Sequence, residues 1–188
     1  SPIAIEATTG SPMAKYLALL FLVSPILCLG LRIAVLGDLH MDPDYVVGSA
    51  ATCLGDELGL TCCRGKEGKG GPAAGRYGAS TCDTPEASIR ALAADICAYT
   101  PDFAIMLGDI VGHHLLHQTP GFAESVLRRA YGILSSACPG LTWYSVIGNH
   151  DTVPVDPFPP APGLETWHSL FQDLWANVSS PAPASPWL

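Results

Sequence analysis

The chain has 188 residues, of which 48% are hydrophobic and 14% charged, and its formal net charge is −8. This length fits one domain or part of one, and the hydrophobic content is ample for a core. Binding to nucleic-acid phosphates needs clustered Lys and Arg, but the 9 basic residues form no patch, so the composition argues against a nucleic-acid partner.

The N-terminus has the pattern of a targeting segment. Residues 1–12 precede Met13 and show no structural pattern, so we expect an unstructured leader. Residues 13–30 carry Lys15, then an apolar run, then the small residue Gly30, which is typical of a secretory signal peptide. The run is too short for a comfortable membrane span. An uncleaved signal anchor is the alternative.

The first strand of the mature protein is expected at residues 31–36, an apolar run typical of a buried parallel strand. Residues 44–80 are irregular and rich in Gly, and a loop of this length needs cross-links or a function. Four cysteines lie in or next to it: Cys53, Cys62, Cys63 and Cys82.

The chain has seven cysteines, and six remain once Cys28 leaves with the predicted signal. An even number in an oxidising compartment favours disulfides, although four cysteines allow three pairings. Zinc ligation by the cluster is the alternative, and the absence of a CxxC pair disfavours it. Cys97 and Cys138 fit a third bridge and two buried thiols equally well.

The rest of the chain alternates helices and strands. Thr84-Pro85-Glu86 predicts a helix start with Thr84 as N-cap, and Thr119-Pro120 predicts another. Strands are expected at 103–107 and 141–147. Residues 153–163 are proline-rich and extended, and 164–178 form a helix whose aromatic face belongs to the core. Residues 180–188 are a Pro/Ala/Ser tail, and Asn177-Val178-Ser179 is an N-glycosylation sequon.

Each of the three strands ends in Gly followed by residues that can bind metals. The motifs are GDLHMD, GDIVGHH and GNHD. Right-handed crossovers between parallel strands place all three ends on one edge of the sheet, where α/β proteins bind ligands. We therefore expect five side chains to converge there: Asp38, His40, Asp109, Asn149 and His150.

Carboxylates, imidazoles and an amide suit divalent Zn, Mn or Fe. Two such ions can hold a hydroxide nucleophile and a phosphoryl oxygen, and a nearby imidazole can protonate the leaving oxygen. The expected reaction is hydrolysis of a phosphate ester.

These motifs resemble the calcineurin-like metallophosphoesterase superfamily. Within it, the chain is similar to acid sphingomyelinase and the acid sphingomyelinase-like phosphodiesterases from about Leu31 to Trp187. Two features are specific to this narrower group: Gly108-Asp109-Ile110 followed by His113 and His117-Gln118-Thr119, and Gly148-Asn149-His150-Asp151 leading to Pro154-Val155 and Phe158-Pro159-Pro160. The likeness also includes Asp38-Leu39-His40-Met41-Asp42 and the cysteine cluster. The resemblance implies an α/β fold, a β-sandwich flanked by helices, with only its N-terminal βαβαβ half present in residues 31–179.

The resemblance also implies residue roles. Asp38 and His40 would bind one metal, Asp109 would bridge two, and Asn149 would bind the second. His150 would contact the phosphate or protonate the leaving group, with His113 assisting. The implied ions are two zincs, and the implied bridges are Cys53–Cys62 and Cys63–Cys82. The implied activity is sphingomyelin phosphodiesterase-like, on a lipid or small phosphodiester, with contact to a lipid surface and a lysosomal or extracellular location.

The chain departs from this family beyond His168. Complete members supply three further metal-binding histidines, and acid sphingomyelinase carries a saposin-like domain; neither is found here. Two alternatives therefore stand beside the phosphodiesterase: a non-catalytic secreted glycoprotein fragment, and a nucleotide phosphatase or phosphomonoesterase of the same superfamily.

Overall fold

The computed structural model describes residues 30–52, 62–65, 71–113, 118–155 and 163–178. The chain divides into two units, Ser1–Leu31 and Arg32–Leu188. Of the first unit only residues 30 and 31 are described, and both are exposed. Residues 13–29 of the predicted signal segment, Cys53, His117 and the C-terminal tail lie outside the described residues. Among the helices that are described, none combines the length and apolar character needed to cross a membrane.

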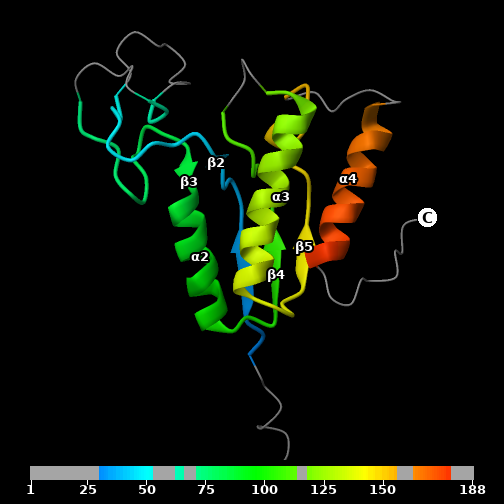
Figure 1. The fold of residues 1–188 in the computed structure, drawn as a ribbon. Helices are drawn as coiled ribbons and strands as arrows, with labels where there is room; N and C mark the ends of the chain where they lie inside the picture. The colour runs from blue at the N-terminus through cyan, green and yellow to red at the C-terminus, as the bar shows by residue number, and fades with distance from the viewer. Residues whose placement is uncertain (1–29, 53–61, 66–70, 114–117, 156–162, 179–188) are drawn as a thin grey trace, which may run out of the picture. The chain divides into compact units, whose positions relative to one another are not determined.

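The second unit contains a parallel sheet of three strands in the order β1 (Ile33–Leu36), β4 (Phe103–Met106) and β5 (Trp143–Ser145). In the register, Ile33 lies opposite Phe103, and Ala104 opposite Trp143. The predicted α/β arrangement of parallel strands is confirmed, with shorter strands than expected (Figure 1).

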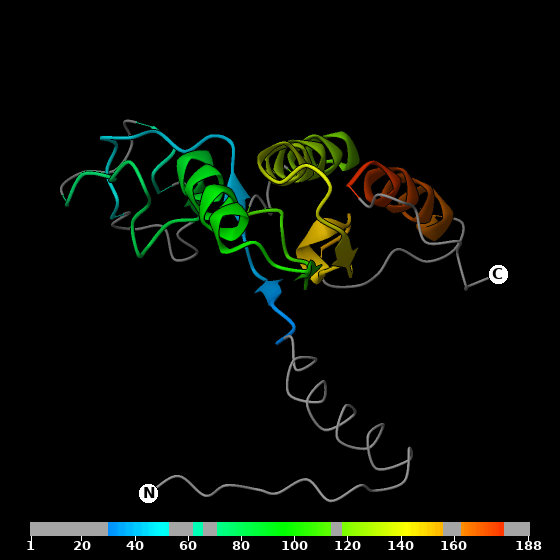
Figure 2. The same cartoon turned by 90° about the horizontal axis from the view of Figure 1, so that it is seen from below.

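Three helices, α2 (Glu86–Tyr99), α3 (Pro120–Ala137) and α4 (Gly163–Val178), cover one face of this sheet (Figures 1 and 2). The start of α3 is as predicted, because the Thr119 hydroxyl accepts a hydrogen bond from the N–H of Phe122, and Pro120 follows it. The predicted N-cap of α2 is wrong by one residue. Thr84 donates its backbone N–H to His40, which draws Thr84 and Pro85 into a short strand and leaves Pro85 as the N-cap.

The core fills the space between the sheet and the three helices. The aromatic face of α4 belongs to it as predicted, with Trp167, Phe171 and Leu174 buried. The opposite sheet face is exposed at Ile33, Val35, Tyr144 and Val146. The expectation that residues 31–36 form a fully buried strand is therefore wrong, because the helices cover one face and β1 is an edge strand.

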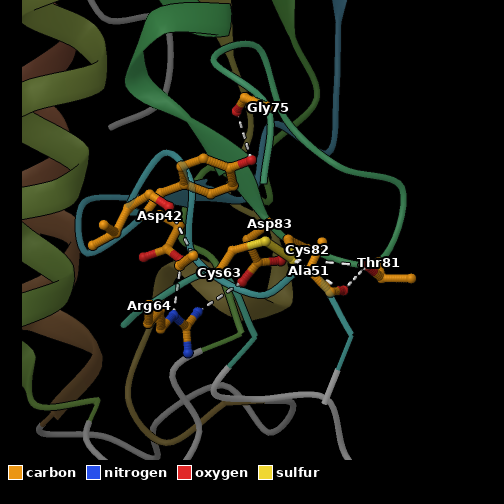
Figure 3. Close-up of a disulfide and its surroundings, with 11 residues drawn as sticks. Asp42, Ala51, Cys63, Arg64, Gly75, Thr81, Cys82 and Asp83 are labelled. Atoms are coloured by element: carbon orange, nitrogen blue, oxygen red, sulfur yellow. Dashed lines mark hydrogen bonds and ion pairs between the residues drawn. A yellow bond between two sulfur atoms is a disulfide. The ribbon is translucent and has the colours of Figure 1, made fainter. Parts of the chain in front are cut away.

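The long irregular region is held by a small parallel pair and a disulfide. Strand β2 (Met41–Asp42) pairs with β3 (Thr84–Pro85), and Cys63 is bonded to Cys82 (Figure 3). A second disulfide, Cys97–Cys138, joins α2 to the residue that ends α3. Of the two alternatives for Cys97 and Cys138, a third bridge or two buried thiols, the structure shows the bridge.

Candidate metal centre

The loops that follow β1 and β4 are joined by backbone hydrogen bonds. The N–H of Asp38 donates to the carbonyl of Gly108 at 3.2 Å, and the N–H of His40 donates to the carbonyl of Asp109 at 2.9 Å. The loops after β1 and β4 therefore run side by side beyond the sheet. This is the convergence that the topology predicts.

The glycines in two of the motifs permit this approach. A Cβ on Gly108 would meet the backbone of Gly148, and a Cβ on Gly148 would meet the backbone N and the carboxylate of Asp109. Gly108 also has a positive φ of 86°, which favours glycine. The backbones of the two loops are in direct contact. Each loop therefore needs glycine, which has no Cβ, immediately before the residue that could bind a metal.

Asp38, His40 and Asp109 form one compact set of potential ligands. Their side-chain ligand atoms all lie within 4.8 Å of one another. The Nδ1 atom of His40 lies 3.1 Å from the carbonyl oxygen of Val111, which can only accept, so Nδ1 carries the proton and Nε2 remains for a metal. All three residues have positive φ, at 54°, 38° and 53°. Such backbone strain at non-glycine residues is concentrated at functional sites.

Three imidazoles form a second set that shares His40. The ring of His113 stacks on that of His40 with centroids 4.5 Å apart, and the ring of His150 lies 5.0 Å from His40 and 4.6 Å from His113. The potential ligand atoms of these three rings also lie within 4.8 Å of one another. The family resemblance assigns His113 and His150 to the substrate, and their rings do border the carboxylate set.

Asn149 and His150 begin the 3-10 turn η2 (Asn149–Asp151). The N–H of His150 donates to the Oδ1 atom of Asp109 at 2.9 Å, which ties this turn to the GD loop. Asn149 is exposed beside it. The structure thus brings together five of the six predicted site residues and places Asn149 in the adjoining turn.

Asp151 is a site residue to which sequence reasoning gave no role. It is buried, and its carboxylate accepts hydrogen bonds from four backbone N–H groups, those of Asp109, Ile110, Val111 and Gly148. Burial raises the pKa of Asp151, and the N–H groups oppose this by favouring the charged form. Asp151 is the last residue of the GNHD motif, and this position was the sequence signal that could have pointed to a role for it. Its role depends on contacts more than 40 residues away and is invisible in one sequence.

A partly buried charge network beside His113 was also missed. It consists of Asp42, Arg64 and Asp83 (Figure 3). Arg64 directly follows Cys63 and Asp83 directly follows Cys82, so the disulfide brings the two together. Their positions after paired cysteines were the only sequence signal.

The candidate metal centre includes exposed residues, because Asp38, His113 and Asn149 are all exposed. A cavity of about 430 Å³ lies elsewhere, between α3 and α4, and none of the predicted ligands lines it. The potential ligand atoms converge at the strand ends instead.

Comparisons with known proteins identify the family of this chain. Residues 31–185 match the calcineurin-like phosphoesterase family. The chain is 34% identical over 164 residues to a sphingomyelin phosphodiesterase of Homo sapiens, covering 84% of this chain and 24% of that protein. It is 30% identical over 163 residues to sphingomyelin phosphodiesterase 1 of Caenorhabditis elegans, covering 84% of this chain and 27% of the relative. The chain therefore spans about a quarter of the length of these relatives. It belongs to the calcineurin-like phosphoesterase family.

Proposed function

We propose that this chain takes part in metal-dependent hydrolysis of a phosphodiester, with its chemistry at Asp38, His40 and Asp109. The observation that carries the proposal is the approach of these three ligand atoms to within 4.8 Å of one another at the ends of β1 and β4. Membership of a phosphoesterase family supports the reaction class.

The donor set fits a divalent ion. Two carboxylates and one imidazole suit borderline ions such as zinc, and the orientation of His40 by a backbone carbonyl is the usual arrangement behind a metal-binding histidine. Asn149, in the turn tied to Asp109, would supply a ligand to a second ion, with Asp109 shared between the two. When bound, such ions lower the pKa of water and neutralise charge on phosphoryl oxygens.

The other contributions to the proposed reaction come from side chains of the protein. Asp109 accepts the N–H of His150, so the shared carboxylate and this imidazole keep a fixed relation. We assign His150 to protonation of the leaving oxygen and His113 to donation to a phosphoryl oxygen. The support is that the two rings lie 4.6 Å apart and both lie next to His40. Asp151 holds the loop that carries Asp109 by its backbone.

We propose a phosphodiester lipid of the sphingomyelin type as the substrate. The support is the names of the relatives, which are sphingomyelin phosphodiesterases. A secretory location, lysosomal or extracellular, is supported by the disulfides Cys63–Cys82 and Cys97–Cys138, which persist in oxidising compartments. Asn177 falls in the last turn of α4 and is proposed as a glycosylation site. Loss of mass on amidase treatment of secreted protein, absent in Asn177→Gln, tests this.

Hydrolysis assays test the proposed reaction. The full chain with added zinc is offered a diester, bis(p-nitrophenyl) phosphate, a monoester, p-nitrophenyl phosphate, and sphingomyelin in detergent micelles. We expect turnover of the diester and of sphingomyelin, lost in Asp109→Asn and retained in the surface variant Asp95→Asn. Turnover of the monoester alone would favour a phosphomonoesterase. No turnover of any substrate would overturn the catalytic proposal.

A further inference from the structure

One carboxylate holds His113 at two points. The Oδ1 atom of Asp83 lies 2.7 Å from Nδ1 of the His113 ring, and Oδ2 accepts the backbone N–H of His113 at 2.6 Å. An ionised carboxylate can only accept, so Nδ1 carries the proton in this contact. Asp83 therefore fixes both the backbone and the ring of His113. The ring has one orientation, in which Nε2 is the nitrogen that Asp83 does not contact.

Asp83 is itself held from behind. Nη2 of Arg64 donates to Oδ2 of Asp83 at 3.0 Å, and Nε of the same guanidinium donates to Asp42, whose side chain is 1% exposed, at 2.8 Å (Figure 3). The disulfide Cys63–Cys82 joins the residues immediately before Arg64 and Asp83. A planar, always charged guanidinium between two carboxylates is a rigid support.

The backbone leaves space for this carboxylate. A Cβ on Gly112 would meet Oδ2 of Asp83 at 2.7 Å and the carbonyl oxygen of Met41 at 3.1 Å. Glycine directly before His113 therefore admits Asp83, and a side chain there would displace it.

The ring that Asp83 fixes faces the metal centre. It stacks on His40 with an interplanar angle of 27° and meets His150 at 64°. Nδ1 of His113 is hydrogen-bonded to Asp83, so Nε2 is the ring nitrogen that remains available on the side of His40 and His150. We propose that Asp83 is a positioning residue: it sets the tautomer and orientation of His113 so that Nε2 faces the phosphoryl group. The catalytic purpose of this orientation rests on the proposed function, whereas the orientation of the His113 ring by Asp83 does not.

Arg64 and Asp83 could instead form an ion pair with a purely structural role, and two variants separate these readings. Asp83→Asn removes the charge and places an amide beside Nδ1. Arg64→Gln removes the same ion pair and keeps the carboxylate against His113. Asp95→Asn, an exposed charge on α2, controls for a general loss of negative charge.

The test is the ¹⁵N spectrum of the His113 ring, recorded on zinc-free protein above pH 8, together with unfolding and turnover. We expect the Nδ1–H tautomer in wild type, Arg64→Gln and Asp95→Asn, and a shift to Nε2–H in Asp83→Asn. Turnover of bis(p-nitrophenyl) phosphate should fall about tenfold or more in Asp83→Asn through kcat, as is usual for residues that orient a catalytic or metal-bound group.

An unchanged His113 spectrum in Asp83→Asn would overturn the proposal, because Nδ1 would then keep its proton without the Asp83 carboxylate. If Asp83→Asn does not fold, Gly112→Ala provides the second test, since it displaces the carboxylate and should also release the Nδ1–H tautomer. Absence of turnover in wild type would refute the proposed function alone, because the spectrum still decides the role of Asp83.

Discussion

The carboxylate of Asp151 accepts the backbone N–H of Asp109 at 3.0 Å, so the last residue of the GNHD motif holds the residue proposed to be shared by two metals. Three further N–H groups donate to the same buried side chain. Asp151 thus connects the loops after β4 and β5, although it offers nothing to the ligand sets.

Replacing Asp151 should therefore cost stability. Asp151→Asn keeps one acceptor oxygen and turns an amide N–H₂ toward backbone N–H groups, which leaves buried donors unsatisfied. We expect a loss of about 3 kcal/mol in the free energy of unfolding, measured by urea denaturation. Asp95→Asn should change it by less than about 0.5 kcal/mol. An equally small loss in Asp151→Asn would contradict the role assigned to this carboxylate.

Gly148→Ala should disrupt the contact between the two loops. The added Cβ would meet the backbone and carboxylate of Asp109, and backbone atoms cannot swing aside. We expect a loss of about 2 kcal/mol or more in stability, together with weaker zinc binding. The matched control is Gly132→Ala in α3, where a Cβ meets nothing within 4 Å. It should stabilise the protein by about 0.5–1 kcal/mol, and similar effects of the two variants would refute the account.

The pH dependence of stability should report on Glu86, which links α2 to α3 through Arg129 and also pairs with Arg90. Burial alone would raise the pKa of Glu86, but the hydrogen bonds and charges of these arginines outweigh it and lower the pKa. A lowered folded-state pKa gives stability that is present above the ordinary value of 4.5 and is lost as the pH falls through the folded value.

Glu86→Gln should accordingly be less stable than wild type at pH 7. The difference should shrink as the pH falls below 4.5 and vanish only below the lowered pKa of folded Glu86. Thermal unfolding over this pH range measures it. Glu124→Gln, which removes an exposed pair within α3, should show little difference at any pH. A stability difference between Glu86→Gln and wild type that stays constant as the pH falls would contradict a lowered pKa for Glu86.

The parts of this protein that could be predicted from its sequence are those set by local pattern. The apolar runs ending in Gly gave three parallel strands, and topology then brought Asp38 and Asp109 together without knowledge of the structure. Thr119-Pro120 gave the start of α3, because its cap is made within four residues.

The parts that could not be predicted depend on distant contacts. Asp151 and Asp83 act on loops that only the fold brings near them, and no spacing in the chain marks that relation. Thr84 has the identity of a helix cap but pairs with β2 instead, since the backbone of His40 lies beside it. The exposure of Ile33 and Val35 depends on which sheet face the helices cover.

Equilibrium dialysis followed by elemental analysis measures the zinc bound by wild type, Asp109→Asn and His168→Ala. His168 is an exposed histidine on α4 and serves as the control. A metal centre at the strand ends predicts stoichiometric zinc in wild type and in His168→Ala, and its loss in Asp109→Asn. Equal zinc in all three proteins, or none in wild type, would contradict a metal centre at the strand ends.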